Sequence, residues 1–94
     1  MYNGSCGGVI MLTMEAIRDA IEDYLRQEKK NGNKYCILSA RDVNRILGIS
    51  KNYGNPRYRQ VCIAMWNVRF FRKQYIEGEE FHADFTVEYK LRLF

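Results

Sequence analysis

Apolar residues first recur at helical spacing directly after Thr13, whose side chain can accept a hydrogen bond at a helix start. They form one stripe: Met14, Ile17, Ile21, Tyr24 and Leu25. Asn31-Gly32-Asn33 is a turn signal that ends this helix. The next apolar run, Tyr35–Leu38, is short and bounded by turn residues, so it predicts a brief strand.

The segment that follows predicts a second helix. Ser39 can cap its start, and Asp42, three residues later, can complete a capping box. One face of this helix is apolar: Ala40, Val43, Ile46 and Leu47. Gly48 can adopt the left-handed conformation that ends a helix, and a polar loop is expected over residues 50–54.

A third helix is predicted after this loop, with Asn55 as its N-cap and Pro56 as its first residue. From Arg57 to Lys73 the chain contains no glycine or proline, so we expect one helix of about four to five turns. Its core stripe is Val61, Ala64, Met65 and Val68, and Cys62, Ile63, Trp66 and Phe70 are apolar as well. Because one chain covers only part of so wide an apolar surface, we expect a homodimer, unless Val9–Leu12 folds back over the same surface.

The last third of the chain predicts a hairpin. Gln74–Glu77 is expected to be one arm and Gly78-Glu79 the turn. From Phe81 onward, apolar and polar residues alternate without a break, which places one face of the second arm on the core. The fold class is therefore α+β, with three helices, a short strand and a C-terminal two-stranded hairpin.

The 94 residues suffice for a single modest core. We expect residues 1–12 to be a leader and residues 13–94 to be the folded domain. No apolar run in the sequence, Val9–Leu12 included, is long enough to span a membrane, and no export signal is visible, so a cytoplasmic protein is expected.

Basic residues are concentrated in the middle of the chain. Residues 34–73 contain nine Lys and Arg side chains and one acidic side chain, Asp42, whereas the flanking segments are acidic in balance. Such a distribution is typical of a protein that presents one face to a polyanion. The alternative is an ordinary solvated surface.

Other chemistry has little support in the sequence. A zinc site would have to combine Cys6, Cys36, Cys62 and His82 from four distant segments, so we expect no metal or other cofactor. Cys36 and Cys62 are expected to be small buried side chains, with a disulfide only in a hyperthermophile. Gly7-Gly8 is not followed by the lysine of a phosphate-binding loop. Because no catalytic motif is visible, we expect that the protein is not an enzyme.

The order of the predicted elements, together with the segment Leu38-Ser39-Ala40-Arg41-Asp42-Val43 through Ile46-Leu47-Gly48-Ile49-Ser50, resembles the winged helix-turn-helix family of DNA-binding domains. Its small size is similar to that of stand-alone regulators of archaea and their viruses and plasmids. The resemblance implies that the helix after Pro56 enters the major groove and that the hairpin, the wing, touches the DNA backbone or the minor groove.

Two features depart from the family pattern. The connection from Gly48 to Asn55 is longer than the usual turn, so the third helix is either displaced or preceded by an extra helical turn. The wing tip carries Glu77, Glu79 and Glu80, which would repel phosphates. We therefore expect DNA contacts to lie at the helix start and the Lys51 loop, and not at the wing tip.

The candidate DNA-binding residues come from three segments: Arg41 and Arg45; Lys51, Asn52 and Tyr53; and Arg57, Tyr58, Arg59 and Gln60. Arginine and glutamine can read base edges, and the cations of the first two segments suit backbone contacts. For the two tyrosines, bonding to phosphate and packing under the loop remain open. Three functions follow as hypotheses: a sequence-specific regulator, a non-specific architectural DNA binder, and a protein-interaction module.

Overall fold

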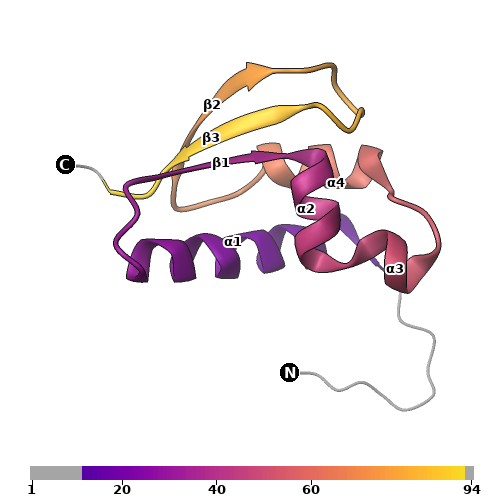
Figure 1. The fold of residues 1–94 in the computed structure, drawn as a ribbon, viewed down its shortest axis with the longest axis horizontal. Helices are drawn as coiled ribbons and strands as arrows, with labels where there is room; N and C mark the ends of the chain where they lie inside the picture. Colours follow the sequence, from indigo (N-terminus) through magenta and orange to yellow (C-terminus); the bar gives the residue numbers. More distant parts are fainter. Residues whose placement is uncertain (1–11, 93–94) are drawn as a thin grey trace, which may run out of the picture.

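In the computed structural model, which describes residues 12–92, the chain is α+β with four helices and one three-stranded antiparallel sheet. The elements are α1 (Met14–Lys30), β1 (Tyr35–Ser39), α2 (Ala40–Leu47), α3 (Ile49–Tyr53), α4 (Tyr58–Trp66), β2 (Arg72–Glu77) and β3 (Thr86–Lys90). The helices lie on one face of the sheet and leave its other face open (Figure 1). Most of the predicted leader lies outside the described residues.

Helix α1 follows its sequence pattern. The Thr13 hydroxyl accepts a hydrogen bond from the Ala16 amide at 3.1 Å, and Asn31 ends the helix. Ile17, Ile21 and Leu25 of the predicted stripe are buried against the rest of the core. The predicted start, end and inner face of this helix are confirmed.

The central strand β3 connects both halves of the core. It pairs with β1 on one side and with β2 on the other, so the strand order is β1-β3-β2. Val87 and Tyr89 are fully buried, and the Tyr89 hydroxyl donates a 2.6 Å hydrogen bond to the Met65 carbonyl at the end of α4. The alternation predicted for this stretch is confirmed from Val87 to Leu91, whereas Thr86, which it places on the polar face, is buried.

The predicted boundaries of α2 are also confirmed. The Ser39 hydroxyl accepts from the Asp42 amide, and the Asp42 carboxylate accepts from the Ser39 amide, each at 3.0 Å. Gly48 adopts φ 65° and ends the helix. These local hydrogen bonds satisfy backbone groups that a helix end would otherwise leave unpaired.

The segment predicted as a polar loop forms the short helix α3, which is the extra turn that the long connection allowed. The Asn44 side chain accepts from the Ser50 amide at 2.8 Å and donates to the Ser50 hydroxyl at 3.0 Å. It thereby starts a new helical turn directly after Gly48. The prediction of three helices is wrong because this side chain bridges two helices across the turn.

Helix α4 is shorter than the predicted helix over residues 57–73. It begins at Tyr58, because Arg57 adopts a left-handed conformation with φ 52°, so Asn55 and Pro56 lie outside the helix. It ends at Trp66, where the Asn67 amide donates to the Ala64 and Ile63 carbonyls and its side chain donates to the Ile63 carbonyl at 2.7 Å. Phe70, with φ 77°, then turns the chain toward β2.

The connection between β2 and β3 is longer than the predicted turn, and Phe81–Phe85 is not a strand. The first two backbone amides of α2 form hydrogen bonds with this segment instead. The Ala40 amide donates to the Phe85 carbonyl at 2.8 Å, and the Arg41 amide donates to the Ala83 carbonyl at 3.0 Å. Helix starts leave such amides free for outside acceptors. Gly78 is required here, because a Cβ atom at this position would overlap the backbone of Asp84.

A buried carboxylate attaches the segment after α4 to α1. Glu22 is 1% exposed and accepts three hydrogen bonds from Arg69, from its amide at 2.7 Å and from its guanidinium at 3.0 and 3.1 Å. Burial alone would raise the pKa of Glu22, but the Arg69 hydrogen bonds outweigh it and lower that pKa. Glu22, a charged residue outside the apolar stripe of α1, is therefore part of the packed interior.

Both cysteines in the described residues, Cys36 and Cys62, are buried free thiols, so no disulfide joins them. Burial raises the pKa of Cys36 to about 11, which keeps the thiol protonated at neutral pH. Over residues 12–92, no helix combines the length and the apolar character that a membrane crossing requires.

Candidate nucleic-acid interface

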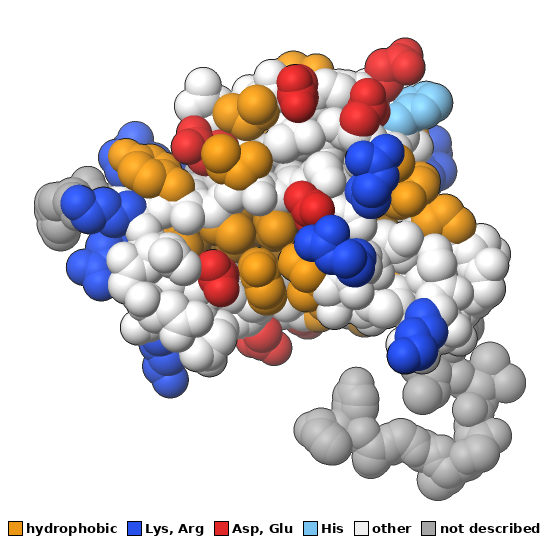
Figure 2. Space-filling model, in the orientation of Figure 1, with side chains coloured by type: hydrophobic (Ala, Val, Ile, Leu, Met, Phe, Trp, Pro, Cys, Tyr) orange, Lys and Arg blue, Asp and Glu red, His pale blue; other side chains and the backbone are white. Residues whose placement is uncertain are grey.

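The predicted DNA-binding residues lie on three successive short helices and the link between them. We call this set the α2–α4 surface: Arg41, Arg45, Lys51, Asn52, Tyr53, Arg57, Tyr58, Arg59 and Gln60. Helix α2 contacts both α3 and α4, so the fold holds the three segments together. Figure 2 shows basic side chains over the region of α2 and α3.

Several cations of this surface carry no carboxylate partner. Within residues 12–92, Arg41, Lys51 and Arg57 form no ion pair, and Arg45 forms only an exposed pair with Asp42 at 3.3 Å. Exposed pairs of this kind contribute little to stability. By contrast, Arg69, which lies between α4 and β2, is held by buried Glu22. The α2–α4 surface therefore leaves positive charge available for an external anion.

The two tyrosines pack against the core. Tyr53 and Tyr58 are both partly buried on the core cluster, which favours the packing alternative for their rings. The Arg57 guanidinium lies 5.6 Å from the centre of the Tyr53 ring, within cation–π distance. Tyr53 thus supports Arg57 in its left-handed position at the entrance to α4.

Two of the predicted base readers are engaged inside the molecule. The Gln60 side chain donates a 3.0 Å hydrogen bond to the Leu12 carbonyl, in front of α1. The Arg59 guanidinium lies 4.7 Å from the centre of the Phe81 ring, in the β2–β3 connection. Beyond Arg59, the exposed residues of α4 include Trp66, and Asn67 is used as a cap. Most of the outward face of α4 is therefore apolar.

The tip of the hairpin is acidic, as expected from the sequence. Glu77, Glu79 and Glu80 are all exposed, and a carboxylate oxygen of Glu79 lies 3.9 Å from Nε2 of His82. Of these, Glu79 and Glu80 line a groove together with Ile63 and Trp66 of α4. A polyanion laid along α4 would meet them, whereas a polyanion on α2 and α3 would first meet cations.

The structure assembles a second group of cations that the sequence analysis did not recognise. We call it the basal surface: Lys29, Lys30, Lys34, Arg72, Lys90 and Arg92. Arg72 and Lys90 are direct partners across the sheet, and Lys90 also faces Tyr35. Blue side chains gather at this end in Figure 2, where α1 ends in Figure 1. None of these six forms an ion pair within the described part of the chain.

An exposed aromatic side chain lies next to the basal surface. Phe70 is 74% exposed, and the guanidinium carbons of Arg26 and Arg69 lie 5.8 and 5.2 Å from its ring centre. It shares a shallow hollow with Lys29, Lys30 and Arg92. The sequence signal for the basal surface was limited to Lys29-Lys30 and the nearby Lys34. Only the strand register shows that Arg72 and Lys90 belong to the same surface.

No group of three or more His, Cys, Asp or Glu side chains within residues 12–92 is placed to hold a metal ion. Cys36 lies on β1, whereas Cys62 on α4 approaches the carbonyl of His82 through its sulfur at 3.7 Å. Cys6, the third cysteine of the zinc alternative, lies outside the described residues.

Comparison of the chain with protein-family models, with curated proteins and with solved structures finds no match.

Proposed function

We propose that this chain is a winged helix-turn-helix domain that binds duplex DNA in the cytoplasm and regulates transcription by occupying its site. The fold assignment is supported by the element order, by the strand order β1-β3-β2, and by the capped helix α2 that ends at left-handed Gly48. In this proposal α2 and α4 are the two helices of the motif, α3 is an inserted turn, and β2 and β3 form the wing.

The observation that carries the proposal is the set of unpaired cations on the α2–α4 surface. Arg41, Lys51 and Arg57 belong to three successive segments of one helical unit, and none has a carboxylate partner within residues 12–92. Phosphate contacts from such side chains supply most of the affinity of a protein for duplex DNA. They also orient the protein on the duplex without reading its sequence.

Sequence reading is assigned to the start of α4. Arg57 lies at the entrance of this helix, and Arg59, within its first turn, reaches a base by leaving the face of the Phe81 ring. Gln60 contributes through its bond to Leu12, which positions the helix, and its amide is not available to a base. A homodimer would place two such helix starts on half-sites about one turn of DNA apart.

A titration against random and selected duplexes at two salt concentrations tests the function. A steep salt dependence with a preferred sequence is the expected result, because phosphate contacts and base contacts act together. A salt dependence without preference would indicate an architectural binder. Absence of binding to every duplex would overturn the proposal. Sedimentation equilibrium at micromolar concentration tests the dimer, which a mass constant at 11.2 kDa would exclude.

A further inference from the structure

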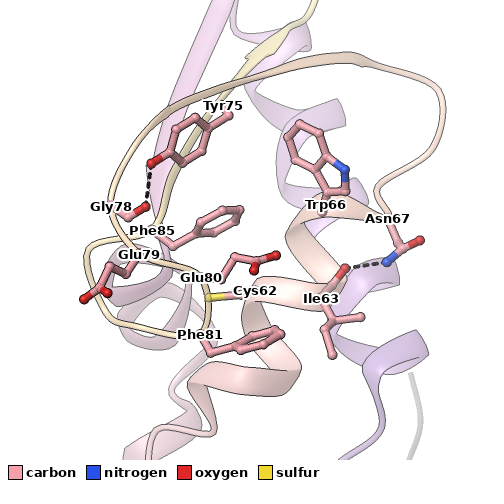
Figure 3. Close-up of a pocket in the computed structure, with 10 residues that line it drawn as sticks. All are labelled: Cys62, Ile63, Trp66, Asn67, Tyr75, Gly78, Glu79, Glu80, Phe81 and Phe85. Carbon is pink, nitrogen blue, oxygen red and sulfur yellow. Dashed lines mark hydrogen bonds between the residues drawn. The ribbon is translucent and has the colours of Figure 1, made fainter.

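An apolar groove lies between the outward face of α4 and the β2–β3 connection. Its volume is about 580 Å³, and aromatic and aliphatic side chains form most of its walls. Figure 3 shows Ile63 and Trp66 on α4 facing Tyr75, Phe81 and Phe85 from the hairpin. An open apolar surface of this kind is typical of a site that binds another molecule.

The charged residues that line the groove are both acidic, Glu79 and Glu80. In Figure 3 the Glu80 side chain extends into the groove from the connection, close to Phe85 and Cys62, whereas Glu79 points away. Within residues 12–92, no cation lies within ion-pair distance of Glu80, and Glu79 approaches only His82. The groove thus offers an unpaired carboxylate beside apolar walls.

Two cations lie near the groove without lining it. Arg59 lies over the Phe81 ring at 4.7 Å, and Lys73 lies over the Trp66 ring at 5.5 Å while its ammonium donates to the Val68 carbonyl. They show that both rings accept a cation on their faces, as electron-rich aromatic faces do. Neither cation neutralises Glu80.

From these observations we propose that the groove binds a segment of a partner protein that carries a bulky apolar side chain next to a lysine or arginine. The apolar side chain fills the space between Trp66, Ile63 and Phe85, and the cation pairs with Glu80. A nucleic acid is a poor occupant, because its phosphates would meet two carboxylates and apolar walls. The inference does not depend on DNA binding, since Arg41, Lys51 and Arg57 do not line the groove.

Trp66 is the single tryptophan of the chain, so its fluorescence reports directly on the groove. The probe is an acetylated and amidated peptide of leucine and lysine, compared with peptides in which glutamine or glutamate replaces lysine. We expect the lysine peptide to change Trp66 emission. Its single ion pair with Glu80 should make it bind up to about fivefold more tightly than the glutamine peptide at low salt. The glutamate peptide should bind most weakly.

Matched variants separate the two parts of the site. Glu80→Gln should remove most of the preference for lysine over glutamine, whereas Glu77→Gln, on β2 outside the groove, should leave it unchanged. Ile63→Ser should weaken all three peptides alike. Because Glu80 is exposed, its variant should keep the far-ultraviolet circular dichroism of the parent.

Three results would overturn the inference. Equal affinity for the lysine and glutamine peptides would show that the carboxylate recognises nothing. An unchanged Trp66 emission during peptide binding would place the peptide elsewhere. A change of emission with protein concentration alone, at a rising sedimentation mass, would assign the groove to a second copy of the chain. DNA titrations on the same samples are independent of the first two outcomes.

Discussion

The α2–α4 surface and the basal surface are both rich in cations, yet the chain builds them in different ways. The cations of the α2–α4 surface come from one stretch of sequence, between Arg41 and Arg59. Those of the basal surface come from the end of α1, the residue before β1, the start of β2 and the end of β3. Charge alone favours the basal surface as the DNA-binding site, whereas the arrangement of helices favours the α2–α4 surface.

The comparison shows that positive charge and a reading geometry are separate properties. Phosphate attraction needs only exposed cations, and both surfaces have them. Insertion into a major groove needs an accessible helix start, a role that we propose for Arg57 and Arg59 on the α2–α4 surface. Removing cations from one surface at a time shows whether charge alone or the helix start determines where DNA binds.

The largest expected effect comes from removing three cations on one surface at a time. Arg41→Ala/Lys51→Ala/Arg57→Ala should lower duplex affinity by about two orders of magnitude at 0.1 M salt and reduce the salt slope by about 3. The matched triple variant Lys29→Ala/Lys30→Ala/Lys90→Ala removes the same charge from the basal surface. It should lower duplex affinity far less. If the basal triple variant loses more affinity in the same titration, the assignment of the surface is wrong.

A smaller effect is expected where the sheet meets α4. Tyr89→Phe removes the hydroxyl that donates to the Met65 carbonyl and leaves that acceptor unpaired. We expect the free energy of unfolding to fall by about 1–3 kcal/mol. Urea denaturation measures it, and an unchanged midpoint would contradict the role given to this bond. DNA affinity of the folded variant should stay unchanged, since Tyr89 belongs to neither surface.

The carboxylate of Glu22 predicts a dependence of stability on pH. Its pKa is lower in the folded chain than the ordinary 4.5, so folding favours the ionised form. This contribution is present above pH 4.5 and is lost as the pH falls through the lower folded pKa. Urea denaturation from pH 6 to pH 3 should show the loss. Glu22→Gln should be less stable at pH 6 and lose less on acidification; equal pH profiles would count against the bond.

The smallest effect is expected at the wing tip. Replacing Glu77, Glu79 and Glu80 with glutamine removes repulsion without creating a phosphate contact, so duplex affinity should stay the same or rise a few-fold at low salt. The gain should disappear at high salt. A loss of affinity in this variant would show that the acidic tip itself takes part in DNA recognition.

Local sequence signals predicted the parts of the fold that local forces determine. Thr13, Ser39 and Gly48 set the ends of α1 and α2 through bonds within a few residues, and the alternation after Phe85 set the inner face of β3. The end of α4 was missed, because the Asn67 cap and the turn at Phe70 oppose a pattern that looks helical. The hairpin connection was missed because amides of α2, distant in sequence, hold it.

The candidate site divides in the same way. Exposed cations were found from their charge together with their place on a predicted helix, for Arg41, or in a predicted loop, for Lys51. The engagement of Gln60 with Leu12 depends on a contact across 48 residues and had no sequence signal. The basal surface required the register that places Arg72 opposite Lys90. The groove required the hairpin to return over α4.

Gly78 limits how the acidic tip can evolve. A side chain at this position would overlap the Asp84 backbone, and its φ of 94° is one that other residues rarely adopt. Glu79, Glu80 and His82, by contrast, are exposed and free to change. In a lineage descended from this chain, the tip can therefore exchange its charge for another, and with it the partner it attracts, as long as position 78 remains glycine.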